Sequence, residues 1–477
     1  MSGAREQFGS RIGFILAAAG SAVGIGNLVG FPVGAAKNGG GAFLLIYAIF
    51  VVAICLPVML AEMTVGRHAK KDPLGSYRKL SGNHKGWKLA GWMSILTPFM
   101  IAVFYLVITV WIFGYLFEAL TGDLDKLANA DTFGMFINSP KIFVYMAAVV
   151  GVVYLILQGG VKEGIEKAAK VLMPALFVML LGLVGFVLTQ DNAMAGVEFY
   201  LIPDFDKIDA SVVNGALSQA FFSLSLGMGI LLTYGSYISN ENDVPNSAKL
   251  VAITDTAVAF TAGLMILPAI FSFNPQIDPN SLSDSSVSMI FTYLPQIFLA
   301  LQDSISYVGA SVVAVLFFLL VFFAAITSLV SILEVPVSAL MDEKDYSRKK
   351  SLILLGIAML VLGCFSALSF GYADFFTLFT HYAGQDKSFF DVIYDVFYDT
   401  VLPLNGFLIC IFVIYRWKQH NFNQSLMQGA EGYEGSFYAK YVNVSLSTFI
   451  PVVLLLIFIN TVCVKYFEFS LFMALFG

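Results

Sequence analysis

The sequence has few charged residues for its length. Only 12% of its 477 residues are Asp, Glu, Lys or Arg, and 58% are hydrophobic, whereas soluble domains carry about 25% charged residues. The mean hydropathy is +0.82. A soluble chain of this length divides into domains joined by polar linkers, and the sequence shows none. These properties exclude an ordinary soluble protein and favour a polytopic membrane protein.

Reactive and metal-binding side chains are also scarce. The four histidines fall in expected loops or at span edges, so we expect no catalytic or metal-binding cluster and no enzyme. Nucleic-acid binding is not expected, because the net charge is −6 and no long basic run occurs. Four cysteines stand in apolar segments without the spacing of a disulfide framework or a metal site: Cys55, Cys364, Cys410 and Cys463.

Apolar segments long enough to cross a bilayer fill the chain. A helix needs about 20 mostly apolar residues to cross the hydrocarbon core, and the stretch after Cys463 is too short to add a span. No cleavable signal peptide is expected, since the apolar run after the polar opening segment lacks a small-residue cleavage site. We expect eleven spans, at about 12–36, 41–66, 90–120, 142–158, 165–189, 211–239, 246–272, 306–341, 351–370, 389–415 and 441–463.

The placement of lysine and arginine predicts the orientation. Cytoplasmic loops are enriched in these residues, and most of the 26 fall inside when the N-terminus is cytoplasmic. We therefore expect a multi-pass protein of the plasma (inner) membrane with a cytoplasmic N-terminus and an extracellular C-terminus. The expected outer segments hold only Lys37, Lys126, Lys141, Lys207, Lys387 and Lys465.

The first and sixth spans contain clusters of glycine. Residues 20–32 read GSAVGIGNLVGFP, and residues 221–229 read FFSLSLGMG. Glycine inside a helix costs about 1 kcal/mol relative to alanine, so we expect both helices to be broken. Unwound backbone at membrane depth is tolerated where it lines a cavity, in which its carbonyls bind cations and its amides bind a carboxylate. Close packing through small residues is the alternative for either span alone.

The sequence resembles the neurotransmitter:sodium symporter family, in its bacterial amino-acid transporter branch. The resemblance rests on these two motifs together with REQFGSR (5–11), KNGGGAF (37–43) and FFAAITS (322–328). The resemblance implies an all-α, LeuT-like fold of two inverted five-helix repeats plus an eleventh helix. It also implies sodium-coupled import of an amino acid by alternating access. The implied parts are a cytoplasmic gate segment (1–11), a first repeat (12–189, broken near 20–27), a second repeat (211–415, broken near 223–229) and a last segment with the eleventh helix and extracellular C-terminus (416–477).

The resemblance implies two sodium sites. Asp255 stands where the family more often has asparagine, and a carboxylate within the membrane indicates function. It would supply the negative charge that chloride supplies in some relatives, and Ala259 replaces their serine, so we expect no chloride requirement. A protonated Asp255 in proton counter-transport is the alternative. The first site would use the Ala22 carbonyl with Asn27, Ser223 and Asp255, and the second the Gly20, Val23 and Ala324 carbonyls with Thr327 and Ser328.

The implied substrate site also includes Ala22 and is otherwise mostly apolar. Its carboxylate-binding groups would be the amides of Ile25 and Gly26 and the Tyr105 hydroxyl. The substrate amine would meet carbonyls near Phe222 and Ser223 and the Ser225 hydroxyl. Gly24 replaces the aspartate of monoamine carriers, which favours an amino acid. Aliphatic or aromatic substrates fit the expected side-chain pocket of Ile101, Phe222, Met228, Ser328 and Ile332.

The expected inner gate follows the family pattern. Arg5 would pair with Asp342, with Tyr237 nearby and Phe8 as an aromatic plug.

The outer gate departs from that pattern, because Gly30 replaces an arginine whose partner would be Asp391 or Asp395. Asp391, Asp395 and Asp399 would share one helical face, either as water-facing residues at a helix start or as a vestibule for a cationic substrate.

The alternatives to a carrier of hydrophobic amino acids are therefore a carrier of a cationic or other small amine and a sensor that does not transport. The bilayer is the other expected partner, and the oligomeric state is left open.

Overall fold

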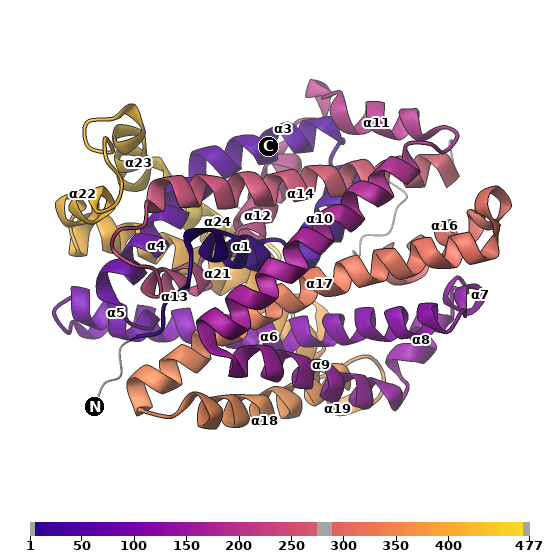
Figure 1. Cartoon of the computed structure of the whole chain (residues 1–477), viewed down its shortest axis with the longest axis horizontal. Helices are drawn as coiled ribbons and strands as arrows, with labels where there is room; N and C mark the ends of the chain where they lie inside the picture. Colours follow the sequence, from indigo (N-terminus) through magenta and orange to yellow (C-terminus); the bar gives the residue numbers. More distant parts are fainter. Residues whose placement is uncertain (1–4, 274–288, 471–477) are drawn as a thin grey trace.

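The structure is a computed structural model that describes residues 5–273 and 289–470 (Figure 1). The first four residues of the expected gate segment, part of the expected 273–305 loop and the last seven residues lie outside these ranges. The helices α6 (Lys85–Leu120), α14 (Val244–Phe273) and α17 (Gln302–Lys344) run along the long axis, and the short helices α5 (Pro73–Leu80) and α7 (Leu124–Leu127) lie at opposite ends.

Nine helical segments of the described chain are long and apolar enough to cross a membrane. A tenth span is formed by the pair of helices Arg11–Ala22 and Gly26–Lys37, which is bent by 54° at the break between them. The sixth expected span is present as two shorter helices, α12 (Ala210–Ser223) and α13 (Ile230–Ser236). The nine are Gly41–Ala69, Lys85–Leu120, Lys141–Gln158, Gly160–Val187, Val244–Phe273, Gln302–Lys344, Arg348–Ala367, Phe389–Arg416 and Phe437–Phe467.

Several of these spans combine α-helix with a π-helical turn, a feature frequent at functional sites. The first span consists of α1 (Arg11–Ala22), η1 (Gly26–Gly30) and α2 (Phe31–Lys37). The second consists of α3 (Gly41–Phe50), η2 (Val51–Cys55) and α4 (Leu56–Ala69). Two other spans do the same: η3 (Gly160–Glu166) with α10 (Lys167–Val187), and α20 (Phe389–Ile393) with η7 (Tyr394–Val401), α21 (Leu402–Ile411) and η8 (Phe412–Arg416). The last span divides into α23 (Phe437–Ser447) and α24 (Phe449–Phe467) without a π-helical turn.

Short elements connect the spans. The described chain has one β-hairpin, of β1 (Thr380–Tyr382) and β2 (Gln385–Lys387), which pair antiparallel with His381 opposite Asp386. The unbroken spans α9 (Lys141–Gln158) and α18 (Arg348–Ala367) also belong to the bundle. The remaining connectors are α8 (Thr132–Ile137), α11 (Ala193–Leu201), η4 (Phe205–Lys207), η6 (Met289–Tyr293), α16 (Leu294–Ala300), α19 (Asp374–Thr377) and α22 (Gln419–Met427).

Both expected helix breaks are present. The first span leaves helical geometry at Val23, whose ψ is 100°. The sixth breaks between Ser223 and Ile230, where Gly227 and Gly229 have φ of +76° and +67°, a conformation that glycine adopts without a Cβ penalty. The Gly227 amide donates to Glu62 Oε1 over 2.7 Å, and its carbonyl accepts from Asn405 Nδ2 over 2.9 Å. Side chains thus satisfy the backbone groups that unwinding frees, as burial in a membrane requires.

The broken helices lie inside the bundle. Helix α1 packs against α10, α14 and α17, while α6 and α17 pack against each other. The peripheral helices expose apolar side chains, including Val144 and Leu155 on α9 and Val178 on α10. Such surfaces are suited to lipid. The first-span break is therefore enclosed by helices whose outer faces are apolar.

Candidate functional site

The unwound parts of the first and sixth spans face each other. Ser225, at φ +55°, donates its hydroxyl to the Ser21 carbonyl over 3.1 Å. Ser223, the last residue of α12, accepts from Asn27 Nδ2 over 2.9 Å. Two segments about 200 residues apart in the chain therefore share one buried polar centre.

Asn27 and Ser223, two of the residues expected at the first sodium site, converge on Asp255, whose side chain is fully buried. Asn27 Nδ2 donates to Asp255 Oδ1 over 2.7 Å, and the Ser223 hydroxyl donates to Asp255 Oδ2 over 2.9 Å. Tyr47 on α3 donates to the same oxygen over 3.2 Å. Sequence reasoning missed Tyr47, which is one aromatic residue among many on an apolar helix. Ala22 is buried at the end of α1.

The residues expected at the second sodium site also meet. The Ser328 hydroxyl lies 3.4 Å from the Gly20 carbonyl, 3.1 Å from that of Ser21 and 3.3 Å from that of Val23. The Thr327 hydroxyl is 3.1 Å from the Ala324 carbonyl, and a Cβ placed on Gly20 would stand 3.4 Å from Thr327 Cβ. The break in the first span therefore directs three carbonyl oxygens at the Ser328 hydroxyl of α17, whereas the Thr327 hydroxyl bonds carbonyls of its own helix.

The hydroxyls of Tyr105 on α6 and Ser328 on α17 lie together beside the first-span break. The Ile25 amide donates to the Tyr105 hydroxyl over 3.3 Å. A Cβ on Gly24 would come within 2.8 Å of both the Tyr105 and the Ser328 hydroxyl oxygens. Position 24 thus has no room for a side chain unless these two residues move. Ile101, Met228 and Ile332, the apolar residues expected in the substrate side-chain pocket, are all buried in the same core.

An aromatic group covers the site on one side. A Cβ on Gly26 would stand 3.1 Å from the Phe222 ring, and Phe222 packs on Tyr398 with ring centroids 4.4 Å apart. Tyr398 stacks on Tyr394 at 4.5 Å, and Phe104 lies 5.3 Å from Tyr394. We call these four rings, Phe104, Phe222, Tyr394 and Tyr398, the aromatic cover.

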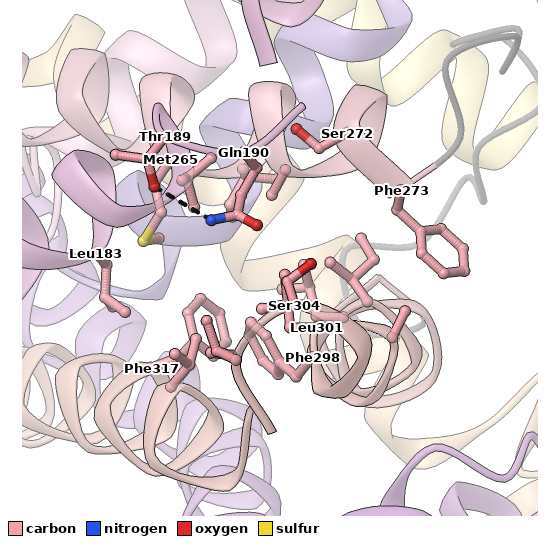
Figure 2. Close-up of a pocket in the computed structure, with 18 of the residues that line it drawn as sticks. Leu183, Thr189, Gln190, Met265, Ser272, Phe273, Phe298, Leu301, Ser304 and Phe317 are labelled. Atoms are coloured by element: carbon pink, nitrogen blue, oxygen red, sulfur yellow. Dashed lines mark hydrogen bonds between the residues drawn. The ribbon is translucent and has the colours of Figure 1, made fainter. Parts of the chain in front are cut away.

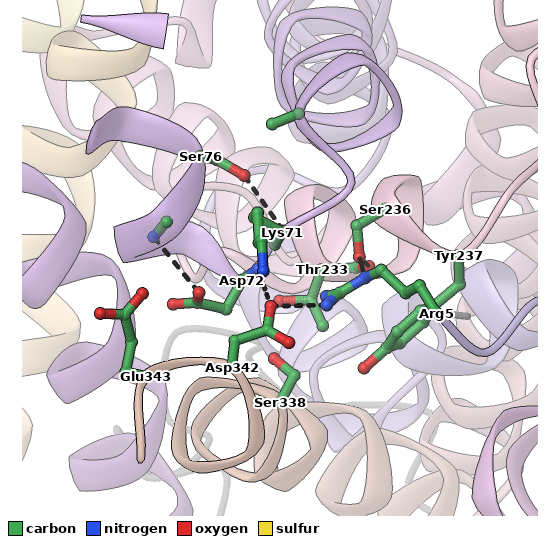
Figure 3. Close-up of polar contacts among 12 residues, drawn as sticks. Arg5, Lys71, Asp72, Ser76, Thr233, Ser236, Tyr237, Ser338, Asp342 and Glu343 are labelled. Carbon is green, nitrogen blue, oxygen red and sulfur yellow. Dashed lines mark hydrogen bonds and ion pairs between the residues drawn. The ribbon is translucent and has the colours of Figure 1, made fainter. Parts of the chain in front are cut away.

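The residues expected at the inner gate contact one another. Arg5 Nη1 lies 2.5 Å from Asp342 Oδ2, and its guanidinium carbon is 4.8 Å above the Tyr237 ring (Figure 3). The Phe8 amide donates to the Tyr237 carbonyl over 3.1 Å. Asp72 adds its backbone amide, 2.8 Å from Asp342 Oδ2. Burial and the neighbouring Asp342 carboxylate raise the pKa of Asp72 to about 7.

A second ionic group stands beside this gate, and sequence reasoning missed it. Arg348 on α18 forms two 2.8 Å bonds to the fully buried Glu334 and one of 3.2 Å to Glu6. Tyr237 donates to Glu334 Oε1 over 2.7 Å. A glutamate inside the apolar run 329–340 was the available signal, because a membrane carboxylate requires a partner.

The outer acidic residues differ from the expectation. Asp391 closes a capping box with Ser388 at the start of α20 instead of pairing across a gate. Asp395 and Asp399 do not continue a regular i, i+4 face, because residues 394–401 form the π-helix η7. Both carboxylates pair with Lys465 of α24, at 2.8 and 2.6 Å. Near Gly30 the nearest side chain is Gln219, which donates to the Gly26 carbonyl over 2.9 Å.

A cavity of about 640 Å³ lies elsewhere, among the ends of α10, α14, α16 and α17. Figure 2 shows Thr189, Gln190 and Ser272 on one side of it and Phe298 and Phe317 on the other. None of the residues expected to bind substrate or sodium lines it. This cavity is therefore separate from the polar centre at the helix breaks.

Two spans broken around converging oxygen atoms, inside a bundle of helices, define a secondary transporter. The model of the sodium:neurotransmitter symporter family matches residues 5–135 and 134–473. The chain belongs to this family and is a sodium-dependent transporter, not an enzyme. It is an integral membrane protein with several spans.

Individual relatives agree with this assignment. The sodium-dependent transporter YhdH of Bacillus subtilis (strain 168), described as uncharacterized, is 32% identical over 464 residues, 96% of this chain and 97% of its own length. A sodium-dependent transporter of Haemophilus influenzae, also described as uncharacterized, is 34% identical over 377 residues, 76% of this chain and 80% of its own. The fold also matches the crystal structure of MhsT in complex with L-phenylalanine, with a TM-score of 0.83. The match covers 96% of this chain and 99% of the MhsT chain, and the two sequences are 40% identical. This match confirms the LeuT-like fold.

Proposed function

We propose that the protein is a symporter that couples the inward movement of sodium to the import of hydrophobic amino acids. The observation that carries this proposal is the environment of Gly24, where two hydroxyls converge on bare backbone and leave no room for a side-chain carboxylate. A substrate that brings its own carboxylate suits this position. The similarity to MhsT, whose structure holds L-phenylalanine, supports an amino acid with an apolar side chain.

The substrate carboxylate would bind where Ile25 and Tyr105 now bond each other. It would accept from the amides of Ile25 and Gly26 and from the Tyr105 hydroxyl, which are donors at a helix start. The amine would meet carbonyls of the sixth-span break and the Ser225 hydroxyl. The side chain would lie among Ile101, Phe222, Met228, Ser328 and Ile332, with Ala22 beside the carboxylate.

Two sodium ions fit the donor sets around the first-span break. The second expected sodium site is suited to a cation because three carbonyl oxygens already surround the Ser328 hydroxyl. The Ala324 carbonyl and the Thr327 hydroxyl lie beside it. The first set combines the Ala22 carbonyl with Asn27, Ser223 and Asp255. A fixed carboxylate here supports chloride independence, because Asp255 already supplies a negative charge beside the cation.

Transport would proceed by alternating access, with the broken helices moving against the rest of the bundle. The Arg5–Asp342 pair closes one side, which we assign to the cytoplasm from the lysine and arginine distribution. The same assignment gives a cytoplasmic N-terminus, an extracellular C-terminus and inverted repeats at 12–189 and 211–415. Sodium and substrate would bind while this pair is intact and leave after it opens.

A binding assay on purified protein tests the substrate class. Labelled L-phenylalanine should bind in sodium and not in potassium, with or without chloride. Unlabelled leucine, phenylalanine and tryptophan should compete, whereas lysine and arginine should not. Sodium-dependent binding of labelled lysine or arginine, with no binding of labelled L-phenylalanine, would replace the proposal with a carrier of cationic substrates.

A further inference from the structure

Four charged residues gather where the β-hairpin, η7 and the end of α24 meet. Lys465 Nζ lies 2.8 Å from Asp395 Oδ1 and 2.6 Å from Asp399 Oδ2, and Lys387 Nζ lies 3.5 Å from Asp395 Oδ2. Asp395 is only 4% exposed. We call Lys387, Asp395, Asp399 and Lys465 the ionic cluster. Two lysines thus neutralise the buried Asp395 and the Asp399 side chain, which is 20% exposed.

The ionic cluster joins the last helix to two neighbouring elements that lie much earlier in the chain. Lys465 belongs to α24, the aspartates to η7 and Lys387 to the β-hairpin. Uncharged contacts follow the same path, since Tyr382 donates to Asp395 Oδ2 over 2.8 Å and packs on Tyr466 at 5.4 Å. The hydroxyls of Tyr466 and Thr400 lie 3.3 Å apart. The end of α24 is therefore attached to η7 at several points.

The η7 turn that Lys465 holds also carries half of the aromatic cover. Tyr394 and Tyr398 alternate with Asp395 and Asp399 in the sequence, and Lys465 Nζ is 6.0 Å from the Tyr394 ring centroid. Tyr398 contacts Phe222, which borders Gly26. An unbroken series of contacts thus leads from the last helix to the backbone at the first-span break.

Charge makes this attachment sensitive to Lys465. Without the ammonium, two neighbouring carboxylates would share the single cation of Lys387, and like charges held close together repel. Removal of one partner from a buried ion pair is strongly destabilising, because it leaves an uncompensated charge. The η7 turn would relieve this strain by moving its carboxylates toward water, and its tyrosines would move with them.

We propose that Lys465 is a positioning residue of the transporter, which holds η7 so that the aromatic cover closes over the substrate site. The last helix is then part of the outer gate. Its Lys465 supplies the positive charge that the first span lacks, because Gly30 replaces the arginine of the family pattern. Because Lys465 neutralises Asp395 and Asp399, the outer path does not select cationic substrates. This inference rests on the proposed substrate site, and its test is separable from that proposal.

The test compares full-length protein with the variants Lys465→Met, Lys465→Arg and Lys141→Met. Lys141 is the matched control, because it pairs with Glu118 over 3.1 Å in an expected outer segment outside the ionic cluster. Hydrogen exchange followed by mass spectrometry reports on residues 389–401 and, for comparison, on 230–236. The second readout is the rate at which labelled L-phenylalanine leaves the sodium-bound protein.

Lys465→Met should raise exchange in 389–401 and the rate of L-phenylalanine release several-fold, with 230–236 unchanged. Lys465→Arg, which keeps the charge, should behave like the parent protein, as should Lys141→Met. The inference is overturned if exchange in 389–401 does not change, if it rises equally throughout the chain, or if release is unaffected. If the parent protein fails to bind L-phenylalanine, the proposed substrate is wrong, and the exchange comparison still decides whether Lys465 holds η7.

Discussion

The side-chain amide nitrogen of Asn27 donates to Asp255 Oδ1 over 2.7 Å, while its oxygen accepts from the Gly24 amide over 3.1 Å. A sodium ion at the first site would bind this amide oxygen, which has a second lone pair besides the one that accepts from Gly24. Asn27 would then connect the ion to the backbone beside the expected substrate carboxylate. Sodium and substrate binding are therefore expected to favour each other.

The charge of Asp255 is expected to set the sodium affinity. Asp255→Asn keeps the shape and removes the carboxylate charge, and one unit charge at 4 Å contributes about 4 kcal/mol in surroundings of intermediate polarity. The sodium concentration for half-maximal L-phenylalanine binding should rise by at least about tenfold, which corresponds to about 1.4 kcal/mol. An unchanged sodium requirement would remove Asp255 from the ion site.

A companion variant tests the chloride argument. Asp255→Asn combined with Ala259→Ser supplies an amide and a hydroxyl where the negative charge was. Chloride should then increase sodium-dependent binding in the double variant, while the parent protein responds equally in chloride and gluconate. A chloride requirement in the parent protein would contradict the role given to Asp255.

Position 24 is expected to tolerate no side chain. The Cβ of Gly24→Ala would come within 2.8 Å of the Tyr105 and Ser328 oxygens, and misplacement of binding groups by about 1 Å can reduce function about 100-fold. We expect L-phenylalanine binding to fall by that order, measured at saturating sodium. Gly182→Ala on α10 is the control, because its Cβ meets no atom within 4 Å and should leave binding unchanged.

The second sodium set predicts a change in cooperativity. Ser328→Ala removes the hydroxyl that three carbonyls surround, so the Hill coefficient for sodium in L-phenylalanine binding should fall from near two toward one. Ser338→Ala is the control, since this buried hydroxyl bonds only the Val335 carbonyl of its own helix. Equal effects of the two substitutions would argue against a sodium site at Ser328.

Arg5 and Arg78 form two ion pairs that should differ in importance. Both members of the Arg5–Asp342 pair are mostly buried, whereas the Arg78 side chain, paired with Glu343, is 42% exposed. Loss of one partner costs about 3–5 kcal/mol for buried pairs and about 0–1 kcal/mol for exposed ones. Arg5→Ala should therefore strongly reduce accumulation of substrate in vesicles, and Arg78→Ala should not. Similar accumulation in both variants would contradict a gate at Arg5.

Local sequence patterns predict the parts of the fold that local chemistry determines. The clusters at 20–32 and 221–229 predict both helix breaks because each glycine inside a helix costs about 1 kcal/mol relative to alanine. The spacing Ser388-Phe-Phe-Asp391 is a readable capping box, and attention to it would have removed Asp391 from the expected outer gate. Family resemblance supplied the remaining site residues, which the fold brings together at the breaks.

Contacts between distant elements were beyond that reasoning. Lys465 and Asp395 are 70 positions apart, and the π-helical turn at 394–401 changes which side chains share a face. Tyr47 and Gln219 resemble ordinary membrane-helix residues until their partners, Asp255 and the Gly26 carbonyl, are placed beside them. Such pairings depend on helix packing, which a single sequence does not specify.

Uptake by purified protein in vesicles tests the central claim most directly. Labelled L-phenylalanine should accumulate when an inward sodium gradient is imposed, with chloride or gluconate as the anion, and not when potassium replaces sodium. Accumulation should saturate and should collapse when the gradient is dissipated. Sodium-dependent binding of L-phenylalanine without any accumulation would contradict the symporter and identify a membrane sensor instead.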